Sequence, residues 1–171
     1  IAARQRIQRL SGEPQGRFIA QYHCELAELA LATGDSSTMR RHLDAAIESN
    51  RNVARAPLIA FAAAAKAGDK LAADAALAEV RRTRPELTVL LAGDLLSLYE
   101  REGSAAAAVE QLAAAQQEAP TTLGLSRLID ASLKIEGRDR AVERLKRELS
   151  AQPSAREATR LLELESARLD P

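Results

Sequence analysis

Hydrophobic residues recur every three or four positions through most of the 171-residue chain, which is the spacing of amphipathic helices. In the segment 17–33, for example, this spacing is followed by Phe18, Tyr22, Leu26, Leu29 and Ala30. The pattern predicts ten helices in total. We place them at about 2–10, 17–33, 36–49, 55–67, 70–83, 86–102, 104–118, 122–136, 138–151 and 154–169.

Four glycines separate these helices at nearly equal intervals. Gly34, Gly68, Gly103 and Gly137 are 34, 35 and 34 residues apart, and each lies between two predicted helices. A period of about 34 residues is the length of a tetratricopeptide unit, which consists of two antiparallel helices and a turn. The sequence therefore predicts an all-α fold, a tetratricopeptide-repeat solenoid of antiparallel helix pairs with about ten helices.

We expect a single solenoid over 1–171, because the repeat pattern runs through the whole chain. Residues 1–19 are the end of an earlier repeat in this interpretation, and 155–171 begin a further one. The complete units are 20–53, 54–88, 89–122 and 123–154. Both ends are predicted to be cut from a longer protein.

Two local signals refine the helix boundaries. Pro57 falls in the first turn of a predicted helix, where its missing N–H costs little. Ser154 and Glu157 have the spacing of a capping box, in which the serine accepts from a backbone N–H and the glutamate reaches back. We therefore expect the last helix to start at Ser154.

Composition narrows the possible functions. The 24 Lys and Arg residues balance the 24 Asp and Glu residues, which argues against nucleic acid as the main partner. The longest apolar run, 58–65, is far too short to span a bilayer. Cys24 is the single cysteine, so no intramolecular disulfide can form and a cysteine-based metal site is not expected. A reducing cytoplasm fits this cysteine usage.

Arginines cluster twice, and acidic residues interleave the second cluster, which favours local ion pairs over recognition of an acidic partner. The clusters are Arg81, Arg82 and Arg84, then Arg138, Arg140, Arg144 and Arg147.

No catalytic constellation stands out. His23 precedes Cys24 directly, but neighbouring residues on a helix point about 100° apart and are poorly placed to share a proton. We expect His23 and Cys24 to serve packing or surface roles, and His42 to be solvated. The chain is predicted not to be an enzyme, with no catalytic, cofactor-binding or metal-ligating residues in this fragment.

Partner binding is expected on the concave groove lined by the first helix of each unit. Of its residues, Arg55, Arg101, Arg127 and Lys134 are the preferred contacts. The predicted groove residues are Gln21, Cys24, Glu28, Arg55, Leu58, Lys66, Asp94, Ser97, Arg101, Arg127 and Lys134. A carboxylate clamp of the co-chaperone type is not expected, because Cys24, Glu28, Leu58 and Ala62 occupy its positions.

The run from Tyr22 to Ala27, Tyr-His-Cys-Glu-Leu-Ala, followed by the Gly34-Asp35 turn, resembles the lipopolysaccharide assembly protein B family of Gram-negative bacteria. The later Arg84-Pro85-Glu86 step fits the same organisation. The resemblance implies a parent protein with three parts. These are an N-terminal inner-membrane anchor, a cytoplasmic tetratricopeptide array, and a C-terminal rubredoxin-like module that binds a metal through two Cys-x-x-Cys pairs.

By this resemblance the chain is a cytoplasmic adaptor on the inner membrane. It would link the deacetylase of the lipid A pathway to a membrane-bound ATP-dependent protease and so regulate lipopolysaccharide synthesis. Two alternatives remain open from the sequence. One is a generic tetratricopeptide scaffold that binds a peptide or protein in envelope or secretion assembly. The other is a domain attached to a catalytic part outside this chain.

Overall fold

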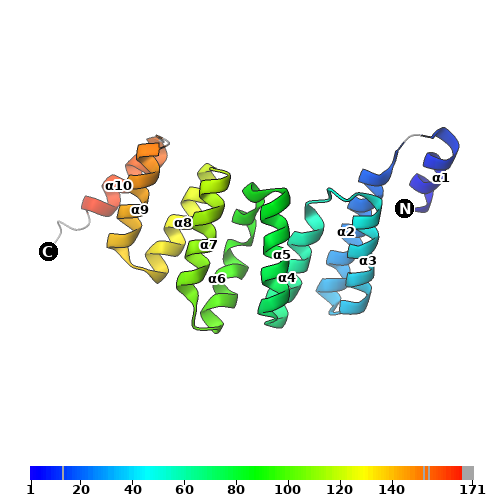
Figure 1. The fold of residues 1–171 in the computed structure, drawn as a ribbon, viewed down its shortest axis with the longest axis horizontal. Helices are drawn as coiled ribbons and strands as arrows, with labels where there is room; N and C mark the ends of the chain where they lie inside the picture. Colours follow the sequence, from blue (N-terminus) through cyan, green and yellow to red (C-terminus); the bar gives the residue numbers. More distant parts are fainter. Residues whose placement is uncertain (13, 152, 154, 167–171) are drawn as a thin grey trace. The chain divides into compact units, whose positions relative to one another are not determined.

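The computed structural model describes residues 1–12, 14–151, 153 and 155–166, and within them it contains ten α-helices, one 3₁₀ helix and no strand (Figure 1). The α-helices are α1 (Ala2–Ser11), α2 (Gly16–Thr33), α3 (Ser36–Ser49), α4 (Arg55–Ala67), α5 (Lys70–Thr83), α6 (Ala92–Arg101), α7 (Ala105–Glu118), α8 (Thr122–Ile135), α9 (Arg138–Ala151) and α10 (Ala155–Ser166). The 3₁₀ helix η1 covers Pro85–Leu91. The prediction of an all-α fold built from helix pairs is confirmed.

The predicted glycine turns join the two helices of each pair. Gly34, Gly68, Gly103 and Gly137 all have φ between 67° and 88°, the left-handed conformation that glycine adopts without a steric penalty. After Gly34, the N–H of Asp35 donates to the carbonyl of Ala30, which closes the end of α2 in a Schellman pattern. The same bond recurs one residue after Gly68 and after Gly103. The repeat in sequence is therefore a repeat in backbone geometry.

Aspartates begin the second helices of the first two pairs. Asp35 accepts a hydrogen bond from the N–H of Thr38, and Asp69 accepts one from Ala72. These are N-caps, which satisfy backbone donors that the first helical turn leaves free. The hydrogen bond from Thr38 is the main reason that the pKa of Asp35 falls to about 2.

One predicted α-helix is in part a 3₁₀ helix, so this prediction was wrong. The segment predicted as a helix over 86–102 consists of η1 followed by α6. Pro85 starts η1, and the β-branched Thr88 and Val89 lose side-chain freedom in an α-helix. The tighter 3₁₀ winding over this stretch is longer than the usual 3–4 residues of such helices. In contrast, Pro57 lies in the first turn of α4, as predicted.

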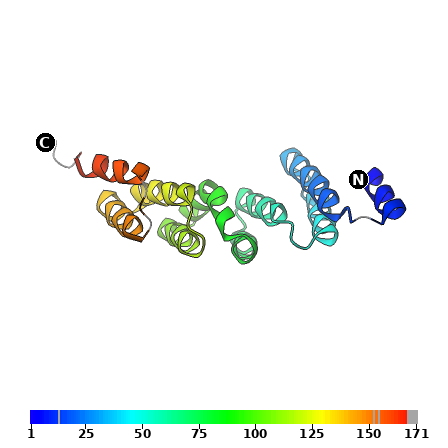
Figure 2. The same ribbon diagram turned by 90° about the horizontal axis from the view of Figure 1, so that it is seen from above.

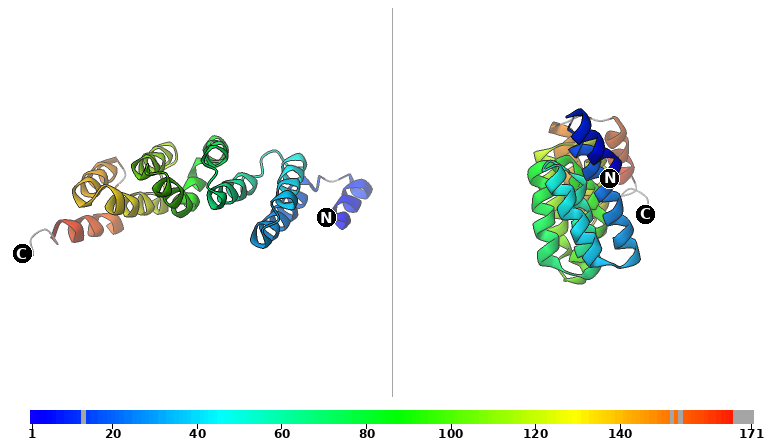
Figure 3. Two further views of the ribbon diagram at one scale, coloured as in Figure 1. Left: turned by 90° about the horizontal axis from the view of Figure 1, so that it is seen from below. Right: turned by 90° about the vertical axis from the view of Figure 1, so that its right-hand side faces the viewer.

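The chain forms two compact units, 1–84 and 85–171, which we describe separately. In the first unit α2 packs on α3, α4 packs on α5, and α4 also contacts α2. Figure 2 and the right view of Figure 3 show the α2–α3 pair in blue and cyan. In the second unit each helix from α6 to α10 packs on the next.

Small side chains form much of the core in the first unit. One cluster joins Ala20, Cys24 and Ala27 of α2 to Leu43 and Ala46 of α3, and it extends into α4. Small residues let helix axes approach closely, so this pair buries its interface with few large side chains. Gly16 is an extreme case, because a Cβ atom there would lie 2.2 Å from the carbonyl oxygen of Ser49.

The second unit is tied together by a partly buried arginine. Arg144 on α9 donates to Glu136 at the end of α8 (Nη2 to Oε1, 2.8 Å) and to Glu110 on α7 (2.6 Å). The hydrogen bond from Arg144 is the main cause that lowers the pKa of Glu136. The expected local pairing is seen at Arg140 and Arg147, which each lie 3.9 Å from Glu143, whereas Arg144 pairs with acidic residues farther away in the sequence.

Predictions at the two ends of the chain had mixed outcomes. α10 forms; Leu161 and Leu164 pack against the core cluster of the second unit, whereas Leu162 is 67% exposed. The proposed capping box cannot be assessed, because Ser154 lies outside the described residues. At the other end, α1 contains no buried residue.

Leu77 and Leu71 provide a test of the helix-face assignment on α5. Leu77 is 3% exposed, whereas Leu71 is 83% exposed. We expect Leu77→Ala to lower the free energy of unfolding by about 2–5 kcal/mol, as for other buried leucines, because it leaves a cavity. Leu71→Ala should change it by less than about 0.5 kcal/mol, as surface substitutions usually do. Urea denaturation followed by circular dichroism measures both, and equal losses would show that the assignment is wrong.

Candidate protein-binding surface

The structure places most of the predicted groove residues on the surface, but not Cys24. Cys24 is fully buried in the α2–α3 cluster, and burial is the largest of the effects on its thiol and raises its pKa. Its prediction as a groove residue was wrong because it lies among the small residues by which α2 packs on α3 and α4. A buried, protonated thiol is also poorly suited to act as a nucleophile.

Two of the four preferred cations form ion pairs with carboxylates on another helix. Arg55 on α4 donates to both carboxylate oxygens of Glu28 on α2, at 2.9 and 2.5 Å. Lys134 on α8 lies 2.5 Å from Glu100 on α6. These bridges connect the first helices of successive pairs, so a partner would have to compete for both cations.

The other predicted groove residues differ in exposure. Arg101 is exposed and donates to the carbonyl of Ser97 one turn earlier. Leu58 is half-buried. The remaining exposed members of the predicted set are Gln21, Lys66, Asp94, Ser97 and Arg127.

The most distinctive surface is an apolar stripe on α2, which we define by Phe18, Tyr22, Leu26 and Leu29. These side chains recur every three or four residues and so share one face of the helix. They are 49%, 38%, 37% and 61% exposed, respectively. The hydrophobic spacing predicted the helix correctly. The buried face of α2, however, is formed mainly by smaller residues.

The same positions are covered in every later pair. Tyr22, Leu26 and Leu29 lie twelve, eight and five residues before the turn glycine Gly34. At these offsets the later pairs carry Ala56, Ala60 and Ala63, then Leu91, Leu95 and Leu98, then Leu125, Ile129 and Ser132. The six residues of the third and fourth pairs are at most 5% exposed. In the second pair, Ala56, Ala60 and Ala63 pack against the cluster of the first pair.

The stripe on α2 therefore corresponds to the face by which α4 packs on the pair before it. On α2 this face is apolar and open, and its residues are larger than those of α4. At its N-terminal end the guanidinium carbon of Arg4, on α1, lies 4.4 Å from the centroid of the Phe18 ring, a cation–π geometry. α1 leaves the rest of the stripe exposed.

Sequence reasoning also missed a contact between the two histidines. His23 on α2 and His42 on α3 are both partly buried, and their Nδ1 atoms are 3.0 Å apart. His23 lies eleven residues before Gly34 and His42 lies eight after it. Positions at similar distances on either side of a turn come close together across an antiparallel pair, and this spacing is the signal that would have found them.

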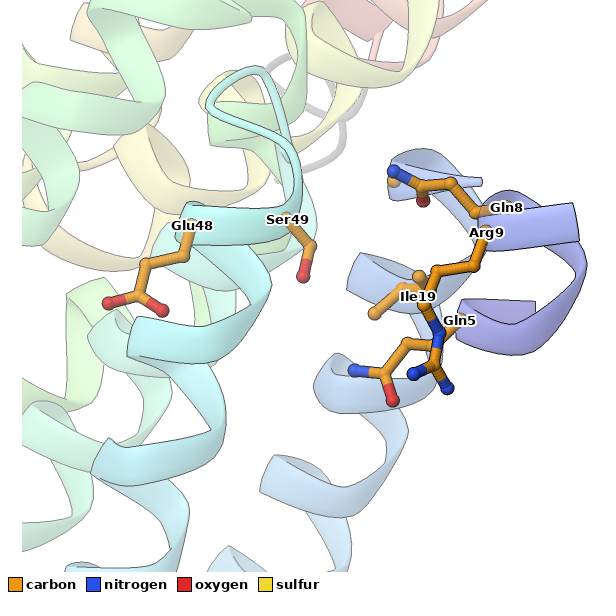
Figure 4. Close-up of a pocket in the computed structure, with 7 residues that line it drawn as sticks. Gln5, Gln8, Arg9, Ile19, Glu48 and Ser49 are labelled. Carbon is orange, nitrogen blue, oxygen red and sulfur yellow. The ribbon is translucent and has the colours of Figure 1, made fainter. Parts of the chain in front are cut away.

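The cleft in Figure 4 is a weaker candidate. Gln5, Gln8 and Arg9 of α1 lie opposite Glu48 and Ser49 of α3, around a space of about 540 Å³. Small-molecule sites are enclosed and mostly apolar. This cleft is open, and Ile19 is its one large apolar side chain.

The described residues contain neither a membrane-spanning helix nor a cluster of metal ligands. No helix there is long and apolar enough to cross a membrane. No group of three or more His, Cys, Asp or Glu side chains gathers in them as metal ligands would.

Comparison with known proteins does not place the chain in a family. No protein-family model matches its sequence, and no curated protein matches it significantly.

The histidine contact predicts a pH dependence. Burial, then the charge of His42, then that of the Ile1 amine lower the pKa of His23 from its ordinary value of 6.5. The unfolded chain therefore binds this proton more readily, and stability should fall as the pH drops below about 6.5. We expect the urea midpoint to decrease between pH 7 and pH 5.5, and to decrease less in His23→Gln. The same decrease in both proteins would contradict the assignment.

Proposed function

We propose that this chain is a non-catalytic protein-interaction module whose partner docks a helix on the apolar stripe of α2. The observation that carries the proposal is the exposure of Tyr22, Leu26 and Leu29, when the equivalent residues of the later pairs are packed. Large apolar side chains gathered on one exposed face are typical of an interaction site.

A helix is the occupant that fits this surface. The equivalent face of α4 is covered by the helices of the first pair, so the stripe continues an interface that this fold already makes with helices. The four side chains also lie along one helical face, as in helix-in-groove recognition, where anchors recur at i, i+4 and i+7. The partner segment should therefore be amphipathic, with its own apolar face against the stripe.

Charge suggests one further property of the partner. Arg4 stands over Phe18 at the N-terminal end of the stripe and donates a hydrogen bond to Gln15. An acidic residue in the partner segment beside Arg4 would gain a favourable interaction without displacing an ion pair.

The resemblance to the lipopolysaccharide assembly protein B family extends the proposal to particular partners. The resembling run contributes Tyr22 and Leu26 to the stripe, and Cys24 and Ala27 to the core beneath it. We propose that the parent protein acts at the cytoplasmic face of the inner membrane. There it would bring the lipid A pathway deacetylase and an ATP-dependent protease together, and raise their effective concentration for each other.

Leu29→Arg tests the docking surface directly. We expect the wild-type chain, immobilised, to capture the purified deacetylase or protease in surface plasmon resonance. Leu29→Arg should weaken capture at least tenfold, or about 1.4 kcal/mol, because it places a charge in an apolar contact. Leu71→Arg is the matched control, since Leu71 is an exposed leucine on α5 of the same unit. It should leave capture unchanged.

The outcomes separate the two parts of the proposal. Failure of both proteins to bind the wild-type chain would refute the link to lipopolysaccharide synthesis and favour a scaffold with another partner. Capture that Leu29→Arg leaves intact would instead rule out the stripe. Loss of capture in the variants Arg101→Glu and Arg127→Glu would then indicate that the partner binds in the predicted groove.

A further inference from the structure

The two histidines of this chain are its only ones, and the fold brings them together. Their ring centroids are 5.2 Å apart and the rings are inclined by 36°. His23 and His42 lie on different helices, so the contact joins α2 to α3 across the first helix pair.

We propose that His23 and His42 form a binding site for one divalent late transition-metal ion, of the group Ni²⁺, Cu²⁺ and Zn²⁺, which both Nδ1 atoms coordinate. This departs from the expectation that the chain holds no metal, which followed from its single cysteine. It is independent of the proposed function, because it involves neither the stripe nor a protein partner.

The distance between the two nitrogens fits such an ion. Two Zn–N bonds of about 2.1 Å at a tetrahedral angle separate the nitrogens by about 3.4 Å. Neighbouring positions of a square-planar Cu²⁺ or Ni²⁺ site, with bonds of about 2.0 Å, separate them by about 2.8 Å. The observed 3.0 Å lies between these values, so the separation changes by only a few tenths of an ångström for either geometry, while both rings turn to aim their lone pairs at the ion.

The protonation state also suits a metal. In the structure one Nδ1 donates its hydrogen to the other, so metal binding requires that proton to move to the Nε2 atom of the same ring. Both Nδ1 lone pairs are then free to coordinate the ion.

The protein supplies two ligands to the proposed ion and leaves its other coordination positions open. Since no third ligand-type side chain gathers with the pair among the described residues, water would complete the coordination sphere. A bound ion would link α2 to α3 and stabilise the folded state over the unfolded one, in which the two rings are far apart.

Nuclear magnetic resonance of the imidazole groups tests the proposal with few signals, because the full chain has two histidines. The chain is first freed of metal with a chelator, and its N-terminus is acetylated so that the Ile1 amine cannot bind metal. Zn²⁺ is then titrated at pH 7.5. We expect the signals of both histidines to shift together and to saturate at one Zn²⁺ per chain, and Ni²⁺ to broaden both.

His42→Gln is the decisive variant, because glutamine keeps a hydrogen-bonding side chain but supplies no imidazole. In it the His23 signal should no longer respond to Zn²⁺ at the same concentration. Calorimetry gives a second measure: Zn²⁺ should raise the Tm of the wild-type chain and not that of His42→Gln. No response at about 1 mM Zn²⁺ would overturn the proposal and leave a simple hydrogen bond. A response confined to one histidine would overturn it too.

Discussion

Within each compact unit the structure depends on one recurring contact, in which the first helix of a pair covers its apolar face against the helices before it: α4 against α2 and α3, and α8 against α7 and η1. Ala56, Ala60 and Ala63 make this contact from α4, and the equivalent residues Leu125, Ile129 and Ser132 of α8 are buried. A repeat of two helices cannot bury this face within itself, so each pair relies on its neighbour for stability. On α2 the same face is apolar but exposed, and the proposed function rests on this difference.

The helices and turns could be predicted from the sequence because their causes are local. A glycine at φ of about 80° ends α2 at Gly34, and an aspartate begins α3, and both residue types favour these positions for backbone reasons. The 3₁₀ form of 85–91 could not be predicted, since the same hydrophobic spacing suits an α-helix. In this form Thr88 and Leu91 are buried, which spacing does not reveal.

The candidate sites were harder to predict because they depend on which face of a helix is covered. On α2 the pattern offers a stripe of large apolar residues and a stripe of small ones, and hydrophobicity alone favours the large ones as core. In the structure the small residues form the buried face, so Cys24 lies in the core and Leu29 lies on the surface. The histidine pair could not be predicted for a related reason. The sequence places His23 beside Cys24, whereas its contact with His42 depends on how α2 and α3 pack across the turn.

The central claim is that the α2 stripe is a docking face for a helix, and photo-crosslinking tests it most directly. A photoreactive amino acid is placed at position 29, or at position 71 as a control, and the chain is illuminated with the deacetylase and the protease present. The account predicts adducts from position 29 only, mapping by mass spectrometry to one amphipathic helix of the partner. Adducts that form equally from both positions, or a bound partner that never crosslinks to position 29, would contradict it.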